Sequence, residues 1–273
     1  MNGTERLMMR VGGCEEHRLL SRTNGREYRI LIARPAEAAP PGGYPVLYTL
    51  DGNATFLTMA EAARLQTRKP HGFDPAVIVG IGYPSDEPFD MNRRCYDFTM
   101  PAGDGTLPAR PDGSPWPEHG GADSFLDFLE CDLQPFVGER FAVDPLRQTI
   151  FGHSLGGLLV LHALFSRPEL FSRYAAGSPS IWWGARAIVT ESEAFIRSFG
   201  GRLPPVRLLF TIGANELPDM VGDAEALFAR LQPFAGESGG FRTSFAKFPE
   251  EGHVSVLPAA ISRVIRFGLS QDP

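Results

Sequence analysis

Residues 149–165 read TIFGHSLGGLLVLHALF, and they set the fold class of the chain. An apolar β-type segment runs into Ser154, which is flanked by glycines, and an apolar helical pattern follows at once. Such a junction has two interpretations. The serine is a nucleophile held on a sharp turn, or the connection is tight and needs small residues only for packing. The stretch alone does not separate them.

Strand and helix patterns alternate along the rest of the chain. Short apolar runs at 45–50 and 76–84 are typical of strands buried on both faces, with a helix expected at about 54–66. The pattern after residue 166 predicts strands and helices in turn, at 172–180, 185–198, 206–213, 220–235, 241–249 and 255–269. This order predicts one α/β domain of residues 1–273, with a mostly parallel central sheet and helices on both faces.

Local signals predict the segments outside this alternation. Residues 17–35 read as a hairpin, in which Asn24-Gly25 supplies the positive φ angles of a tight turn. Ser124 and Asp127 have capping-box spacing, with Asp in place of the usual Glu, and predict that a helix begins at Ser124.

Residues 101–121 are the least regular part of the chain. They read PAGDGTLPARPDGSPWPEHGG, which is crowded with Pro and Gly and excludes a helix or a central strand. The segment is too long for an ordinary connection, so it is either a binding loop or lid, or a flexible surface loop.

Composition excludes several classes of protein. The formal net charge is −6 and both signs are mixed along the chain, so we expect no nucleic-acid partner. Three widely spaced cysteines argue against a disulfide framework and a Cys-rich zinc site. No apolar run is long enough to span a bilayer, and the N-terminus lacks the apolar core of a secretory signal. We therefore expect a cytoplasmic protein, or a periplasmic one whose signal has been removed; the oligomeric state has no signature in the sequence.

Ser154 lies in Gly152-His153-Ser154-Leu155-Gly156, which fits the G-x-S-x-G nucleophile elbow. The elbow needs a serine at the carboxyl end of a strand, small residues two before and two after it, and a helix that begins immediately. The predicted elements meet all three requirements, which favours the catalytic interpretation.

A serine hydroxyl needs a base, and His253 is the best placed of the six histidines. It follows the last predicted strand, and such sheets gather catalytic groups at the carboxyl ends of their strands. His153 is expected to point away from the serine across the turn, and His162 to be a packed helix residue.

An acidic residue should orient His253 from the loop after the penultimate strand. Glu216 and Asp219 both occur there, and Glu216 is the predicted acid because it is nearer the strand end. Asp219 is expected to cap the next helix instead. The order serine, acid, histidine is the one expected of an α/β-hydrolase fold.

Two backbone N–H groups should form an oxyanion hole. One is expected from Leu155 and the other from Gly52 or Asn53, in a loop that Asp51 braces. The chain has no H-E-x-x-H, no paired C-x-x-C, no phosphate-binding G-x-x-x-x-G-K-[ST] and no dinucleotide glycine pattern. We therefore expect no metal site and no cofactor.

The chain resembles the Putative esterase family of α/β-hydrolases, and within it the enterobactin and bacillibactin esterases, which hydrolyse siderophore trilactones. The motifs that carry the resemblance are YTLDGNATF, RRCYDFTMPA, GGADSFLDFL, GHSLGGLLVLHALF, SPSIWW and the GH of FPEEGH. The resemblance implies Ser154 as nucleophile, His253 as base and Glu216 as acid. Some relatives are described as Ser–His dyads.

The resemblance also implies residues that contact the substrate. Trp182 and Trp183 resemble pocket-wall residues, with core packing as the alternative. Arg93 and Arg94 lie at the R-x-x-D-x-T pattern, and an arginine near the site would attract an anionic ferric tris-catecholate. The alternative is a structural Arg94–Asp97 pair that fixes the loop.

The expected function is a serine esterase that cuts ester bonds of a catecholate siderophore and so releases its iron, which enters only as part of this small-molecule substrate. A general carboxylesterase or acyltransferase for small acyl esters is the second hypothesis. A non-catalytic binding protein on the same fold is the third.

Overall fold

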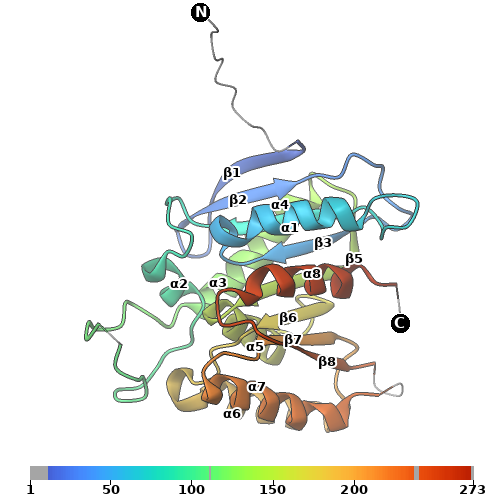
Figure 1. The fold of residues 1–273 in the computed structure, drawn as a ribbon. Helices are drawn as coiled ribbons and strands as arrows, with labels where there is room; N and C mark the ends of the chain where they lie inside the picture. The colour runs from blue at the N-terminus through green and yellow to red at the C-terminus, as the bar shows by residue number, and fades with distance from the viewer. Residues whose placement is uncertain (1–11, 111, 237–239, 272–273) are drawn as a thin grey trace, which may run out of the picture.

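The described residues of the computed structural model, 12–110, 112–236 and 240–271, form one eight-stranded sheet with helices on both faces (Figure 1). The strand order is β1-β2-β4-β3-β5-β6-β7-β8. The β1–β2 and β2–β4 pairs are antiparallel, and every pair from β4–β3 to β7–β8 is parallel. The predicted α/β-hydrolase fold is confirmed.

The strands, in chain order, are β1 (Cys14–Leu20), β2 (Glu27–Ala33), β3 (Tyr44–Thr49), β4 (Val77–Gly82), β5 (Val143–His153), β6 (Arg173–Gly177), β7 (Arg207–Gly213) and β8 (Arg242–Phe248). The helices are α1 (Gly52–Gln66), α2 (Met91–Asp97), α3 (Ala122–Phe128), α4 (Gln134–Gly138), α5 (Leu155–Ser166), α6 (Trp183–Ser198), α7 (Pro218–Leu231) and α8 (Val256–Leu269). A π-helical segment, Leu129–Leu133, joins α3 to α4, and a 3-10 turn, Gln232–Phe234, follows α7.

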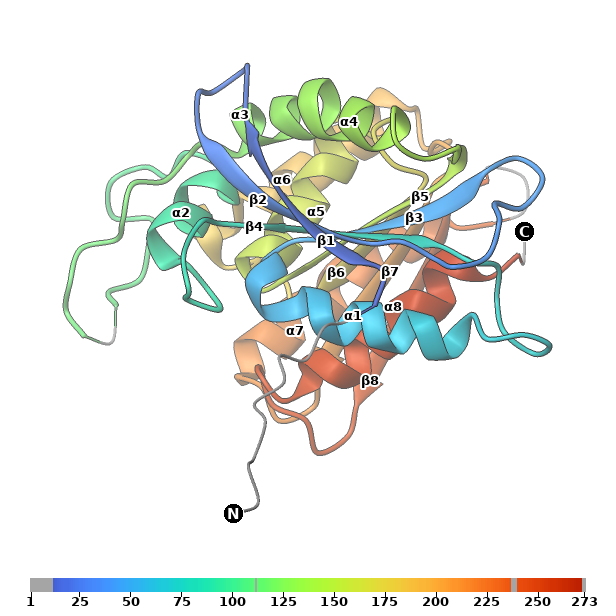
Figure 2. The same cartoon turned by 90° about the horizontal axis from the view of Figure 1, so that it is seen from above.

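Each face of the sheet has its own core. Helices α1 and α8 pack side by side on one face, and α3, α4 and α5 lie on the other (Figure 2). Neighbouring residues of one strand enter different cores: Ile150 of β5 packs with α5, whereas Phe151 packs with α1 and α8. Because side chains alternate along a strand, burial on both faces requires the unbroken apolar runs seen in the sequence.

Two local predictions are wrong. Strands β1 and β2 form the predicted hairpin, but its turn is not the tight Asn24-Gly25 turn. The connection is a longer loop in which the N–H of Ser21 bonds the carbonyl of Arg26, and of the Asn24-Gly25 pair only Gly25 has a positive φ. Helix α3 begins at Ala122 rather than Ser124, and no side chain caps it. The N–H of Gly121 instead bonds the Tyr96 carbonyl, so contact with α2 fixes the start of this helix.

The segment 101–121 connects α2 to α3 and has no helix or strand in its described part, as predicted. It projects beside α2 in Figure 1. Several contacts attach it to the body: among them, Trp116 packs on the aromatic rings of Trp182 and Trp183, and the carbonyl of Thr106 accepts the N–H of Ala185 at the start of α6. The loop is therefore anchored beside the segment that follows β6.

Candidate active site

Ser154 lies on a strained turn between β5 and α5. Its φ is 60° and its ψ −117°, a backbone conformation that residues other than glycine rarely adopt. The N–H of Ser154 donates to the Gly177 carbonyl at 2.9 Å, which ties the turn to the end of β6. Helix α5 begins at the next residue. The structure thus has the strand, turn and helix that a nucleophile elbow requires.

The glycines around Ser154 differ in how tightly they are packed. A Cβ on Gly152 would collide with the backbone of Gly156, and one on Gly157 would lie 2.6 Å from the carbonyl oxygen of Gly177. A Cβ on Gly156 would meet nothing nearer than a Leu50 methyl at 3.5 Å, an ordinary contact. A Cβ therefore fits two residues after the serine, and the closer backbone approach falls one residue later, at Gly157.

His253 and Glu216 form a hydrogen-bonded pair at the same edge of the sheet. Nδ1 of His253, from the β8–α8 loop, lies 2.7 Å from Oε2 of Glu216, from the β7–α7 loop. The His253 side chain is 35% exposed, whereas that of Glu216 is fully buried. Because Nδ1 is engaged by the carboxylate, Nε2 is the nitrogen left to exchange a proton with a reactant.

The other carboxylate oxygen of Glu216 is held by two donors. Oε1 accepts the Ser178 hydroxyl at 2.6 Å and the N–H of Gly213 at 2.7 Å. Burial works against ionisation, but the hydrogen bonds from His253, Ser178 and Gly213 outweigh it and lower the pKa of Glu216 below its ordinary value. The acid is therefore ionised and fixed in orientation. Sequence reasoning missed Ser178, which lies within the predicted 172–180 segment and directly after the observed end of β6.

Asp219, the alternative acid, is not at this position. It is exposed on the first turn of α7, which begins at Pro218 and has Leu217 at its N-cap. The predicted capping role of Asp219 is therefore also wrong. The helix begins with a proline near its first position, where no N–H is needed.

The hydroxyl of Ser154 lies 3.3 Å from that of Ser180, a buried residue that sequence reasoning did not select. Within the described residues, no hydrogen bond joins Ser154 to His253. Catalytic hydrogen bonds are often long or unformed in a ligand-free enzyme and shorten when substrate binds, so this geometry does not exclude Ser154 as the nucleophile.

His153, the residue before Ser154, contacts the imidazole of His253. Its ring centroid lies 4.6 Å from that of His253. Burial, together with the adjacent His253, lowers the pKa of His153 to about 3. A neutral ring therefore packs beside the imidazole of His253. His162 is buried in α5 as predicted, and its two ring nitrogens contact Glu191 and Asp123.

The predicted oxyanion donors lie at the starts of two helices, which follow the neighbouring strands β5 and β3. Leu155 is the first residue of α5 and Gly52 the first of α1, and N–H groups in a first helical turn have no acceptor within their helix. The N–H of Leu50 bonds the carbonyl of Phe151, so the ends of β3 and β5 are directly paired. The two helix starts therefore adjoin each other at the serine.

Asn53 can contribute only its backbone to this loop. Its side-chain amide donates to the carbonyls of Tyr83, Ser85 and Glu87, and its side-chain oxygen accepts the N–H of Tyr83. The side chain thus fixes the β4–α2 loop against α1.

Arg94 is buried beneath the site rather than exposed in it. Its guanidinium forms a two-bond ion pair with Asp51, so the Arg94–Asp97 pair expected as the alternative is wrong. Its Nη2 also donates to the carbonyl of His153, the residue before Ser154. Arg93 donates to the carbonyl of Glu27 and lies over the rings of Tyr28 and Tyr83.

The two predicted pocket-wall tryptophans differ in exposure. Trp183 is fully buried and donates its indole N–H to the Met100 carbonyl, which is the packing alternative. Trp182 is partly exposed and follows Ser180 by two residues. Sequence reasoning missed Trp116, which packs on both from the 101–121 loop.

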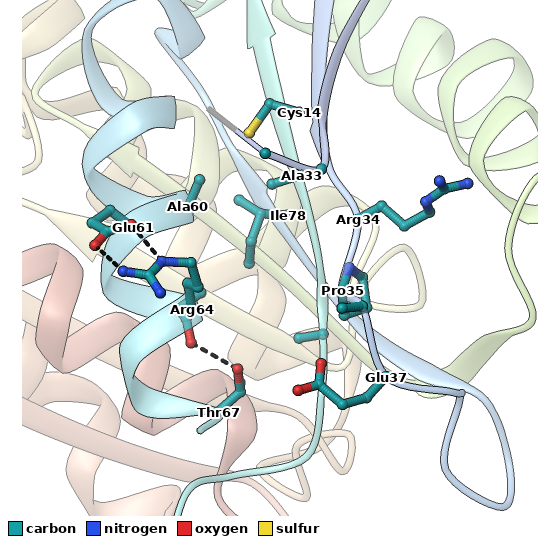
Figure 3. Close-up of a pocket in the computed structure, with 15 residues that line it drawn as sticks. Cys14, Ala33, Arg34, Pro35, Glu37, Ala60, Glu61, Arg64, Thr67 and Ile78 are labelled. Carbon is teal, nitrogen blue, oxygen red and sulfur yellow. Dashed lines mark hydrogen bonds and ion pairs between the residues drawn. The ribbon is translucent and has the colours of Figure 1, made fainter. Parts of the chain in front are cut away.

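A separate hollow of about 600 Å³ lies between α1 and the segment after β2 (Figure 3). Thr67 and Ala76 line it, at the end of α1 and just before β4, so it opens at the amino ends of the parallel strands. Ser154 lies at the carboxyl ends. We therefore do not assign this hollow to the chemistry of the serine.

No group of three or more metal-binding side chains occurs in the described part of the chain, and Cys14, Cys95 and Cys131 are free thiols. Among the helices of that part, none combines the length and apolar character needed to cross a bilayer.

Comparison with known proteins places this arrangement in a family. The family model described as "Putative esterase" matches residues 21–198. The ferri-bacillibactin esterase BesA of Bacillus subtilis is 44% identical over 276 residues, which cover 99% of this chain and 94% of the relative. The siderophore enterobactin esterase of Emericella nidulans is 44% identical over 244 residues, 81% of this chain and 80% of that protein.

A solved structure also matches this chain over nearly its whole length. The BES protein from Bacillus cereus superposes with a TM-score of 0.90 at 37% identity, over 98% of this chain and 100% of that one. With Ser154 on its elbow and the Glu216–His253 pair beside it, this chain belongs to the Putative esterase family of α/β-hydrolases.

Proposed function

We propose that this protein is a serine esterase that hydrolyses the ester bonds of a catecholate siderophore trilactone and thereby releases its iron. The observation that carries the proposal is the Glu216–His253 pair at the edge of the sheet that holds Ser154. The relatives named as ferri-bacillibactin and enterobactin esterases support the substrate class.

The first half of the reaction forms an acyl-enzyme. Oγ of Ser154 attacks the ester carbonyl carbon while Nε2 of His253 takes the hydroxyl proton. Glu216 stabilises the resulting imidazolium through Nδ1. The N–H groups of Leu155 and of Gly52 or Asn53 hold the negative carbonyl oxygen. Collapse of this intermediate breaks the ester C–O bond, and the leaving alkoxide takes the proton from His253.

The second half frees the serine. His253, again neutral, takes a proton from water as the water oxygen attacks the acyl carbon. The oxyanion forms at the same two N–H groups, and its collapse releases the carboxylic acid and returns the proton to Ser154. One water is consumed for each ester bond that is cut, and no metal or cofactor takes part in these steps.

Cutting the ring has a physical consequence for the bound iron. A trilactone tethers three catecholates, so each remains at high effective concentration around the ferric ion. Opening the tether lowers that effective concentration and weakens the hold on the metal. Iron is therefore cargo of the substrate in this proposal.

The aromatic residues beside the site fit a substrate of this kind. Trp182 is the partly exposed tryptophan that follows Ser180, and Trp116 lies against it from the 101–121 loop, with ring centroids 5.8 Å apart. Aromatic faces of this kind stack on flat rings such as a catechol. We assign Trp182 and Trp116 to one wall of the substrate site.

A hydrolysis panel with the wild-type protein and Ser154→Ala tests the proposal. The substrates are ferric and iron-free bacillibactin and enterobactin, and short p-nitrophenyl esters. We expect trilactone opening to exceed short-ester turnover in kcat/KM, and Ser154→Ala to abolish both while its thermal melting curve stays unchanged.

Other outcomes would identify the alternatives. Much faster turnover of short esters than of any trilactone would indicate a general carboxylesterase. If a fluorophosphonate probe failed to label Ser154 in the folded wild-type protein, the chain would be a binding protein on this fold.

A further inference from the structure

The segment that follows β6 holds the backbone of Ser154 at two points. The carbonyl of Gly177 accepts the N–H of Ser154 at 2.9 Å, and the N–H of Ser180 donates to the carbonyl of Ser154 at 3.1 Å. Gly157 lies against the same segment, because a Cβ there would lie 3.0 Å from Cα of Pro179. These backbone contacts fix the Ser180 side chain beside the nucleophile.

The hydroxyl of Ser180 meets that of Ser154 at this point. Their Oγ atoms lie 3.3 Å apart, and among the described residues neither hydroxyl has another hydrogen-bond partner. Ser180 is 1% exposed, so bulk water does not reach its hydroxyl. A buried hydroxyl without a partner costs free energy, so the contact with Ser154 is the one that satisfies it.

The reaction decides which of the two hydroxyls donates. In the resting protein either oxygen can do so. Once Ser154 has given its proton to His253 and carries the acyl group, its Oγ is an ester oxygen without a proton and can only accept. Ser180 loses no proton in either half of the reaction, so it becomes the donor.

The strength of this hydrogen bond changes during deacylation. The ester Oγ of the acyl-enzyme is a poor acceptor, because it shares its electrons with the carbonyl group. When the tetrahedral intermediate collapses, the C–Oγ bond breaks, its electron pair returns to Oγ of Ser154, and His253 supplies the proton. Because Oγ becomes a better acceptor along this path, the hydrogen bond stabilises the transition state more than the acyl-enzyme.

Acylation has no comparable gain from this contact. The free Ser154 already accepts the hydrogen bond from Ser180 before it attacks, so the ground state and the transition state are stabilised to a similar extent. Interactions of equal strength in both states do not accelerate a step. Loss of the Ser180 hydroxyl should therefore slow deacylation selectively.

We propose that Ser180 is a further catalytic residue, which donates a hydrogen bond to Oγ of Ser154 as that oxygen leaves the acyl carbon. The inference rests on the proposed ester hydrolysis and deepens it. A hydrogen bond between neutral groups contributes a modest net free energy, so its loss should slow deacylation about 3- to 10-fold.

Pre-steady-state kinetics with p-nitrophenyl trimethylacetate separate the two halves of the reaction. The first burst of p-nitrophenolate reports acylation, and the hindered acyl group leaves slowly enough to be followed by intact mass. We expect Ser180→Ala to deacylate about 3- to 10-fold more slowly and to keep its acylation rate constant within about twofold. Ser180→Cys, which fills the site with a weak donor, should show the same selective loss.

Ser192→Ala is the matched control. Ser192 is also fully buried, but it lies within α6, where its hydroxyl donates to the carbonyl of Val189 at 2.6 Å. This variant should keep both rate constants within about twofold of the wild type. Thermal melting curves of all the variants establish that they are folded.

A folded Ser180 variant that deacylates within about twofold of the wild type would overturn the role. Equal losses in acylation and deacylation would also overturn it, because they would show that Ser180 only supports the position of Ser154. The simple ester separates this test from that of the siderophore substrate. An enzyme that opens no trilactone still gains and loses the acyl group, whereas a wild-type protein that the ester does not acylate contradicts the proposed function itself.

Discussion

Oε2 of Glu216 lies 2.7 Å from Nδ1 of His253, while its Oε1 is held by Ser178 and Gly213. Ser178 and Gly213 thus orient the carboxylate of Glu216, and this carboxylate orients the imidazole of His253. Gly213 is the last residue of β7, and Ser178 follows β6, which lies between the strands that precede Ser154 and Glu216. The order of strands therefore places Ser178, Glu216 and His253 in contact one after another along the carboxyl edge of the sheet.

Glu216→Gln should lower kcat by about 100- to 10,000-fold with little change in KM. An amide can donate its NH₂ group to Nδ1, which places the ring proton on Nε2 and leaves no base for Ser154. Steady-state kinetics with one ester substrate measure the effect. Asp219→Asn, on the exposed first turn of α7, is the control and should keep wild-type kcat. Equal losses in the two variants would contradict the assignment of Glu216.

Gly157→Ala should weaken both stability and reactivity, because its Cβ would lie 2.6 Å from the carbonyl oxygen that accepts the Ser154 N–H. We expect a loss of about 1–3 kcal/mol in the free energy of unfolding, and slower labelling of Ser154 by a fluorophosphonate. Gly156→Ala, which meets only ordinary contacts, should change stability by less than about 0.5 kcal/mol. Urea denaturation compares the pair, and a Gly156→Ala variant as damaged as Gly157→Ala would refute this account of the elbow.

The sequence predicted the order of strands and helices after the hairpin because each buried strand must be apolar on both faces, as β3 and β5 are. It also predicted where Ser154 and His253 would lie, since the carboxyl ends of parallel strands meet at one edge of the sheet. These are consequences of periodicity and chain order, which a single sequence contains.

Pairs that form across the fold left no local signal. Arg94 and Asp51 are 43 residues apart, and nothing in the spacing of Arg94 separates Asp51 from the nearer Asp97 as a partner. Trp116 lay in a segment without periodicity, so its packing on Trp182 was not predictable. At Ser124 a good capping residue was overridden by the contact of Gly121 with α2.

Trp116→Ala should release the 101–121 loop from Trp182 and Trp183. We expect KM for a bulky trilactone to rise about tenfold, because one aromatic wall is lost, while a short p-nitrophenyl ester keeps its kcat/KM within about twofold. Trp116→Phe preserves a ring and serves as the control. Equal effects on the bulky and the short substrate would show that Trp116 acts on the fold and not on binding.

Asp97→Asn should stabilise the protein at neutral pH and leave it unchanged in acid. Asp97 is fully buried, and neither carboxylate oxygen has a hydrogen-bond partner within the described residues. Burial raises its pKa to about 6, although the nearby charges of Arg93 and Arg26 and the adjacent hydroxyls of Tyr83 and Tyr28, which do not reach hydrogen-bond geometry, oppose the shift.

The direction of this pH effect on the free energy of unfolding follows from whether the folded or the unfolded chain binds the proton. Between about pH 4 and pH 6 the unfolded chain has lost this proton while the folded chain keeps it, so the contribution of Asp97 to the free energy of unfolding falls as pH rises. Above about pH 6 the loss is complete and amounts to at most about 3 kcal/mol, which asparagine removes. Urea denaturation of both proteins at about pH 4 and pH 7 measures it.

Asp132→Asn is the control with the opposite sign. Burial of Asp132 opposes ionisation, but hydrogen bonds from Arg22 and Ser21 outweigh it and lower the pKa of this carboxyl. Its contribution to stability is therefore present at neutral pH and lost as pH falls through the lowered pKa. Asp132→Asn should destabilise the protein at about pH 7, and less so in acid. If Asp97→Asn destabilised the protein at neutral pH as Asp132→Asn does, the Asp97 carboxylate would be paired in solution, and the buried unpaired charge inferred beside α2 would be wrong.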